Sequence, residues 1–100
     1  MKDDNQIIEP PDDLDGAKVI KWAWSGHKPF GLLSIVDSDS EPIEVYGLAI
    51  CQYSDSNGVY RFSCDKDWEV QQDGLYQSVE DAIGQLPDQY KLITAKWQTK

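Results

Sequence analysis

The sequence predicts an α+β domain: a mainly antiparallel sheet of about five to six strands, with one helix from the C-terminal half packed on one face. Three observations support this class. Two runs rich in β-forming residues flank Asn57-Gly58, the strongest short-range signal for a hairpin. Shorter runs of alternating apolar and polar residues stand before and after that hairpin. A single helical pattern begins at Ser78 and is followed by Pro87.

The chain of 100 residues is long enough for one domain, which we expect to span residues 17–100. We expect residues 1–16 to form a disordered acidic arm. This arm holds six carboxylates against one lysine, so it carries five of the nine net negative charges of the chain. Pro10 and Pro11 interrupt regular structure there, and the like charges repel one another.

Residues 17–25 are expected to form the first strand. Strict alternation puts Ile20, Trp22 and Trp24 on one face and Val19, Lys21 and Ala23 on the other. Two tryptophans on one face form either a wall of the core or a platform that stacks nucleic-acid bases. The acidity of the chain favours the core. A loop at residues 25–31, a second strand at 32–36 and an acidic turn at 37–42 are expected to follow.

The central hairpin, residues 44–65, is expected to bury one of its faces. If Asn57 and Gly58 are the central residues of a type I′ turn, both take the positive φ that these residue types adopt at least cost. One face then collects Ala49, Cys51, Tyr53, Tyr60, Phe62 and Cys64. The opposite face, expected to be exposed, collects Gln52, Ser54, Arg61 and Ser63, with Leu48 and Ile50 nearer the strand start. A four-residue loop preserves these faces, whereas a three-residue loop puts the two apolar sets on opposite faces.

The two-residue turn places Cys51 directly opposite Cys64, with Cα atoms roughly 4.5 Å apart. Such a pair has the geometry to form a cross-strand disulfide. Two interpretations remain open: a redox-sensitive bond, or two small hydrophobic residues in the core. No signal-peptide pattern is seen at the start of the sequence, so we expect a cytoplasmic protein with reduced thiols.

After the hairpin, residues 68–72 are expected to form another strand and Asp73-Gly74 a turn. Ser78 is placed to cap the helix, with Asp81 at the spacing of a capping box. The helix carries one apolar stripe, made of Val79, Ala82, Ile83 and Leu86. Residues 89–98 alternate in hydrophobicity and are expected to form the last strand, with a short helix as the alternative.

Charge and motifs exclude several classes of function. A net charge of -9 disfavours nucleic acid and anionic membranes as partners, because both attract cationic surfaces. We expect no cofactor, because the sequence has no glycine-rich phosphate loop. We expect no metal either: the alternate carboxylates at 37, 39 and 41 lack the glycine and the later glutamate of an EF-hand, which leaves weak calcium affinity as a distant alternative. The single histidine, His27, is expected on a surface loop. We therefore expect a protein that is not an enzyme, with catalysis through His27 as a distant alternative.

Two carboxylate clusters at turns or strand ends are the candidate partner-binding residues: Asp37, Asp39, Glu41 and Glu44, and Asp65, Asp67, Trp68 and Glu69. If the clusters meet in space, they form an anionic patch with an aromatic anchor, which suits a basic protein partner. In size, acidity and α+β pattern the chain resembles bacterial immunity proteins, which neutralise basic toxins. The resemblance implies an inhibitor that masks its partner. A redox-responsive module using Cys51 and Cys64, and an accessory structural domain, are the alternatives.

Overall fold

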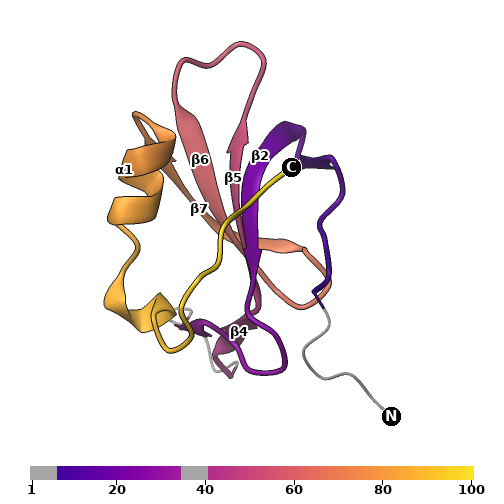
Figure 1. Ribbon diagram of the computed structural model, residues 1–100, viewed down its shortest axis with the longest axis vertical. Coiled ribbons are helices and arrows are strands. Elements are labelled where there is room, and N and C mark those ends of the chain that lie inside the picture. The colour runs from indigo at the N-terminus through magenta and orange to yellow at the C-terminus, as the bar shows by residue number, and fades with distance from the viewer. Residues whose placement is uncertain (1–6, 35–40) are drawn as a thin grey trace.

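The computed structural model describes residues 7–34 and 41–100 (Figure 1). Its main sheet has six antiparallel strands and is strongly curled, like half a barrel, with one short α-helix against it. Two further strands form a small separate sheet. The predicted α+β class is therefore confirmed. The elements in chain order are β1 (Asp13–Leu14), β2 (Ala17–Trp24), β3 (Gly31–Leu33), β4 (Ile43–Val45), β5 (Gly47–Gln52), β6 (Val59–Cys64), β7 (Val70–Tyr76), α1 (Val79–Gly84), the 3-10 turn η1 (Asp88–Tyr90) and β8 (Gln98–Thr99).

The strands of the main sheet lie in the order β1-β2-β5-β6-β7. Strand β8 also pairs with β2, and it lies beyond β1 along the same edge of β2. The first and last strands of the chain are therefore neighbours on one edge. Among the described strands, β3 and β4 pair only with each other. No described helix is long and apolar enough to cross a membrane.

Residues 7–16 differ from the disordered arm that the sequence suggests. Strand β1 pairs with β2, and Leu14 is buried opposite Ala17. Asp15 and Gly16 connect the two strands with φ of 51° and 83°, so this two-residue connection has the positive φ values of a type I′ turn. The predicted disordered arm does not include this Asp-Gly hairpin, because a two-residue strand is too short to show an alternating pattern.

Strand β2 is confirmed, but its side chains do not alternate throughout. Its register against β5 shifts between Val19 and Lys21, which marks a β-bulge. Val19 therefore joins Trp22 and Trp24 in one core cluster, whereas Ile20 packs with Ile50 and helix α1 on the other face. The prediction that Ile20 shares a face with the two tryptophans is wrong, because strict alternation requires a regular strand.

The β5–β6 hairpin has the predicted apolar face and a different register. Cys51 lies opposite Tyr60 and Cys64 opposite Gly47, so the connection spans residues 53–58. Neither residue of the Asn-Gly pair has positive φ, and the predicted type I′ turn is wrong. Because six residues is also an even number, the faces are kept, and the buried set on one face is Ala49, Cys51, Phe62 and Cys64.

Ser56 gives a local reason for the longer loop. Its N–H donates to Tyr53 O at 3.2 Å, and its Oγ accepts the N–H of Gly58 at 3.3 Å. Ser56 thus forms hydrogen bonds with both ends of the six-residue loop, Tyr53 and Gly58. These local bonds compete with further pairing of the two strands.

Both faces of the main sheet are covered. Trp22 and Trp68 join the apolar set on one face, while Leu48 and Ile50 are fully buried on the other. Arg61 shares this second face and is 7% exposed, so its expected exposed position is wrong. Its Nη1 donates to Ala82 O at 2.6 Å, and its guanidinium lies 4.6 Å from the centre of the Tyr76 ring. Helix α1 covers this arginine because its apolar stripe packs on the same face.

Strand β7 differs from the prediction, whereas the cap of helix α1 agrees with it. Asp73 and Gly74 continue β7 instead of turning, which corrects the prediction. A Cβ at position 74 would lie 3.2 Å from the Tyr76 ring, so this glycine permits close packing within a strand. The predicted cap is confirmed, since Ser78 Oγ accepts the N–H of Asp81 at 3.1 Å.

Residues 89–98 form neither the expected strand nor the alternative helix. Only η1 and β8 are regular, and the segment between them is irregular. Its half-buried apolar residues pack on the core cluster around Phe30 and Leu48: Ile93, Ala95 and Trp97. The alternating hydrophobicity therefore reflects one-sided packing of an irregular segment.

Candidate functional site

The first predicted cluster is only partly within the described residues. Asp37 and Asp39 lie outside them. Glu41 and Glu44 are exposed, the latter on β4. Glu44 accepts a hydrogen bond from the Tyr46 hydroxyl, and the pKa of Tyr46 is raised by burial and then by the charge of Glu44. Glu44 is thus partly engaged within the protein.

The second cluster is the turn between β6 and β7, and Asp65 has a structural role in it. Asp65 Oδ1 accepts the N–H groups of Asp67 at 2.9 Å and Glu69 at 3.0 Å, and Oδ2 accepts the side-chain amide of Gln71 at 3.2 Å. These bonds fix the turn, as Asp side chains commonly do. Asp67 and Glu69 are exposed and remain accessible to a partner.

Trp68 does not provide the predicted aromatic anchor for a partner. Its side chain is buried, with 6% exposure. Its ring lies 5.7 Å from that of Trp24 and 6.3 Å from that of Trp22, and its Nε1 donates to Ile8 O at 3.1 Å. The predicted role is wrong because the ring fills the core, where it fixes the N-terminal segment to the sheet.

The predicted cysteine pair is also corrected. Cys51 and Cys64 are free and fully buried, and four positions of the β5–β6 ladder separate them. Four positions correspond to about 13 Å along a strand, which is beyond the Cα separation of a disulfide. Burial raises the pKa of both thiols, that of Cys51 to about 12. Both cysteines act as small core residues, and the redox-responsive module loses its basis.

A different acidic group comes together around Tyr53. The Tyr53 hydroxyl donates to Asp15 O at 3.1 Å, and its ring lies 5.3 Å from that of Tyr60 in an edge-to-face arrangement. Burial raises the pKa of Tyr53, and the charge of Asp15, the phenol of Tyr60 and the charge of Asp73 raise it further. Asp15 and Asp73 come from the β1–β2 turn and from β7, so the curled sheet brings distant carboxylates to one phenol.

We call this region the Tyr53 surface and define it as Asp13, Asp15, Tyr53, Tyr60 and Asp73. Its three carboxylate residues are exposed and its two tyrosines are half-buried. Beside it lies a hollow of about 480 Å³, whose lining includes Asp13, Lys18 and Tyr53. The sequence signal that could have located it is Asp15-Gly16, since a type I′ turn there folds the acidic segment back onto β2.

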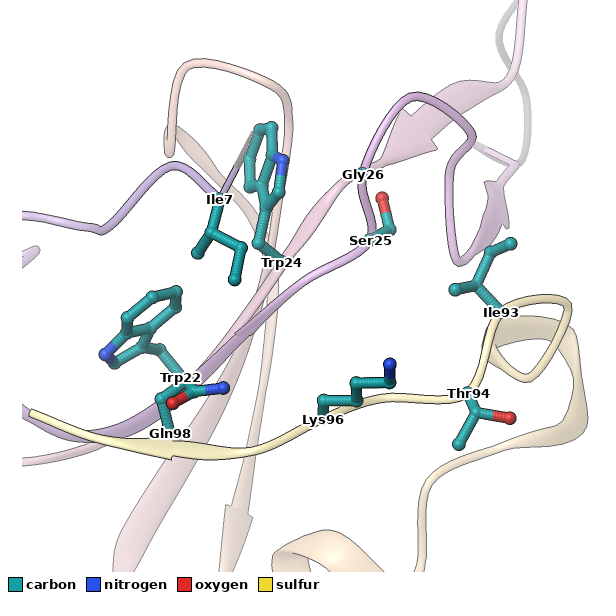
Figure 2. A pocket seen from close by; sticks show the side chains of 9 residues that line it. All are labelled: Ile7, Trp22, Trp24, Ser25, Gly26, Ile93, Thr94, Lys96 and Gln98. Atoms are coloured by element: carbon teal, nitrogen blue, oxygen red, sulfur yellow. The ribbon is translucent and has the colours of Figure 1, made fainter. Parts of the chain in front are cut away.

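A second hollow lies at the opposite end of β2 (Figure 2). It has a volume of about 460 Å³ and lies between the β2 edge and the C-terminal segment. Figure 2 shows Trp22 and Trp24 on one side with Ile7 between them, and Lys96 extending from the other. We call this hollow the edge cavity; its lining is Ile7, Trp22, Trp24, Ser25, Gly26, Ile93, Thr94, Lys96 and Gln98.

The single histidine of the sequence lies outside the Tyr53 surface and the edge cavity. His27 is exposed in the loop after β2, as predicted. Among the described residues, no group of three or more His, Cys, Asp or Glu side chains is placed to hold a metal ion. Comparison of the chain with protein-family models, with curated proteins and with solved structures finds no match.

Proposed function

We propose that this protein is a small binding domain without enzymatic activity that masks a basic protein partner, in the manner of an immunity protein or inhibitor. The Tyr53 surface is the contact region. The observation that carries the proposal is the contact of the half-buried Tyr53 with the acidic β1–β2 turn: its hydroxyl donates to Asp15 O at 3.1 Å, beside a hollow whose lining includes Asp13. The charge of Asp73 acts on the same phenol and raises its pKa. Tyrosines surrounded by carboxylates suit arginine side chains, which stack on the ring while pairing with the acids.

The distribution of positive charge supports the same partner. Arg61 is buried under the helix and adds little to the surface. Lys100 is engaged by Glu9 at 2.9 Å and by Asp12 at 3.3 Å. The chain already carries a net charge of -9, so the accessible surface is strongly anionic. Such a field speeds encounter with a basic protein and repels nucleic acid and anionic membranes.

The test is a comparison of capture by matched charge variants. The wild-type protein and the double variant Asp15→Asn, Asp73→Asn are immobilised and exposed to extract of the source cells. A double variant of equal charge change, Glu80→Gln, Asp88→Asn, is the control, because both side chains are exposed and lie on α1 and η1, outside the Tyr53 surface. We expect one stoichiometric basic protein on the wild type and the control, released by salt and lost from the first variant.

Kinetics with the purified captured protein give the second readout. Neutralising Asp15 and Asp73 should slow association, and more so at low salt, because screening weakens long-range attraction. Equal on-rates for the two double variants would contradict the Tyr53 surface as the contact region. We also propose that the protein acts in the cytoplasm, where the two buried thiols stay reduced.

A further inference from the structure

The edge cavity lies against a stretch of the β2 edge that pairs with no described residue. In an antiparallel sheet, successive residues of a strand direct their backbone N–H and C=O groups alternately to its two neighbours. Ser25 N–H donates to Tyr46 O at 3.0 Å, on the β5 side. Trp24 therefore directs its N–H and C=O groups to the opposite edge, which is the side of β8.

The β2–β8 ladder ends at Trp22, one hydrogen-bonded pair before Trp24. Trp22 lies opposite Gln98, and Lys100 N–H donates to Ile20 O at 2.9 Å. In this register the next pair is Trp24 with Lys96, and among the described residues that pair does not form. Figure 2 shows the C-terminal segment diverging from β2 between Gln98 and Ile93. The Trp24 donor and acceptor thus face the edge cavity.

The other groups of the cavity complement this backbone edge. Lys96 projects from the C-terminal segment into the space between that segment and β2, and no described carboxylate forms an ion pair with it. Trp22, Trp24 and Ile7 supply apolar surface on one side. Ser25 Oγ, another lining group, is buried and has no hydrogen-bond partner in the part of the chain that the structure describes. A volume of about 460 Å³ lies within the range of cavities that bind small ligands.

We propose that the edge cavity binds the carboxyl terminus of a peptide with an apolar last residue. The amide groups of the peptide extend the β2 edge by pairing with the N–H and C=O of Trp24, as in strand addition. The terminal carboxylate accepts a hydrogen bond from Lys96 Nζ, and the apolar side chain contacts Trp22 and Ile7. Backbone pairing, a cation and an apolar wall together select this ligand over a neutral peptide segment.

The negative charge of the whole molecule does not prevent this binding. Screening limits the reach of distant charges to about 8 Å at physiological salt. The contact between Lys96 and the carboxylate is shorter than that, so it outweighs the remote carboxylates. The cavity is also separate from the Tyr53 surface, since the length of β2 places the Asp15-Gly16 turn roughly 25 Å away. The two proposals are therefore tested independently.

The experiment is an NMR titration of the full chain with N-acetyl-Gly-Ala-Leu, as the free acid and as its carboxamide. We expect the free acid to shift the Trp24 backbone amide in a saturable manner and to bind more tightly than the carboxamide. Lys96→Gln should weaken binding of the acid by roughly five- to tenfold, as for loss of one charge-assisted hydrogen bond. It should also abolish the preference for the acid over the carboxamide.

Lys91→Gln is the matched control, because Lys91 lies in the same C-terminal region and pairs with Asp88 at 3.5 Å. Its affinity for the free acid should equal that of the wild type. The proposal is overturned by equal affinity of the acid and the carboxamide for the wild type, or by equal effects of Lys96→Gln and Lys91→Gln. It is also overturned if the Trp24 amide shows no saturable shift with a Kd of about 1 mM or tighter.

Discussion

Trp68 is held in a left-handed backbone conformation, with φ of 63°, by the contacts of its ring. A Cβ at Gly47 would approach that ring to 2.6 Å, so glycine is needed beneath it. The ring also packs on Trp24, and its Nε1 binds the backbone of Ile8. Together these contacts offset a backbone cost of about 1–3 kcal/mol. Trp68 therefore anchors both its own turn and the N-terminal segment.

The buried thiols should make stability depend on alkaline pH. The pKa of Cys51 is raised from 9.0 to about 12, and that of Cys64 is also raised, because burial disfavours the thiolate. Above pH 9 the unfolded chain loses thiol protons that the folded chain keeps. The free energy of unfolding should then fall as pH rises from 9 toward 12, by up to about 1.4 kcal/mol per pH unit for each thiol.

Urea unfolding between pH 8 and 10 measures this dependence. Tyrosines contribute less over this range, because their ordinary pKa is 10.0 and the unfolded chain loses most phenol protons above it. The double variant Cys51→Ala, Cys64→Ala should show a much shallower slope over the same range. An identical slope in both proteins would assign the alkaline loss to other groups.

At the scale of elements, the two hairpins of the main sheet use different turn chemistry. The β1–β2 connection needs positive φ at Asp15 and Gly16, whereas Asn57 and Gly58 in the β5–β6 loop do not adopt it. The loop is held instead by Ser56, through its backbone N–H and its hydroxyl. Asp or Asn followed by Gly therefore forms a tight two-residue turn at only one of the two sites.

Substitution should reveal this difference directly. Gly16→Ala places a Cβ at φ of 83° and should lower the free energy of unfolding by about 1–2 kcal/mol. Asn57→Ala, in the exposed loop, should change it by less than about 0.5 kcal/mol. Chemical denaturation of both variants supplies the comparison. A larger loss for Asn57→Ala than for Gly16→Ala would favour the tight turn that the Asn-Gly pair suggests.

At the scale of the whole molecule, Lys100 joins the two ends of the described chain. Its Nζ donates to Glu9 Oε2 at 2.9 Å and to Pro10 O at 2.8 Å, and it lies 3.3 Å from Asp12 Oδ1. The hydrogen bond to Glu9 is the largest influence that raises the pKa of Lys100. The N-terminal segment in turn covers Trp68 through the carbonyl of Ile8. The C-terminal lysine thus stabilises the cover of one core face.

Lys100→Met should release that cover without unfolding the sheet. We expect faster hydrogen exchange at Val19 N–H, which binds Asp12 O at 2.9 Å, and at the indole N–H of Trp68. Exchange in β5 and β6 should stay unchanged. Lys91→Met is the control, because its ion pair with Asp88 is exposed and local. Equal exchange in the two variants would show that the N-terminal segment is held by its apolar contacts alone.

Local signals account for the elements that the sequence predicts correctly. The cap at Ser78, the apolar stripe through Ala82 and the alternating faces of residues 49–64 are properties of a few neighbouring residues. The two faces of a hairpin are predicted correctly even when its register is not, because every loop with an even number of residues leaves the same side chains on each face. The acidity that motivates the proposed basic partner is equally a property of composition.

The sequence by itself thus determined the fold class, the helix with its cap, the central apolar hairpin face and the anionic character of the protein. Only the tertiary structure decided the bulge at Ile20, the burial of Arg61 and Trp68, the separation of the two cysteines and the gathering of carboxylates at Tyr53. The physical reason is the distance along the chain between the residues that interact. Caps, alternation and charge depend on near neighbours, whereas burial, register and the meeting of distant side chains depend on how a curled sheet closes on itself.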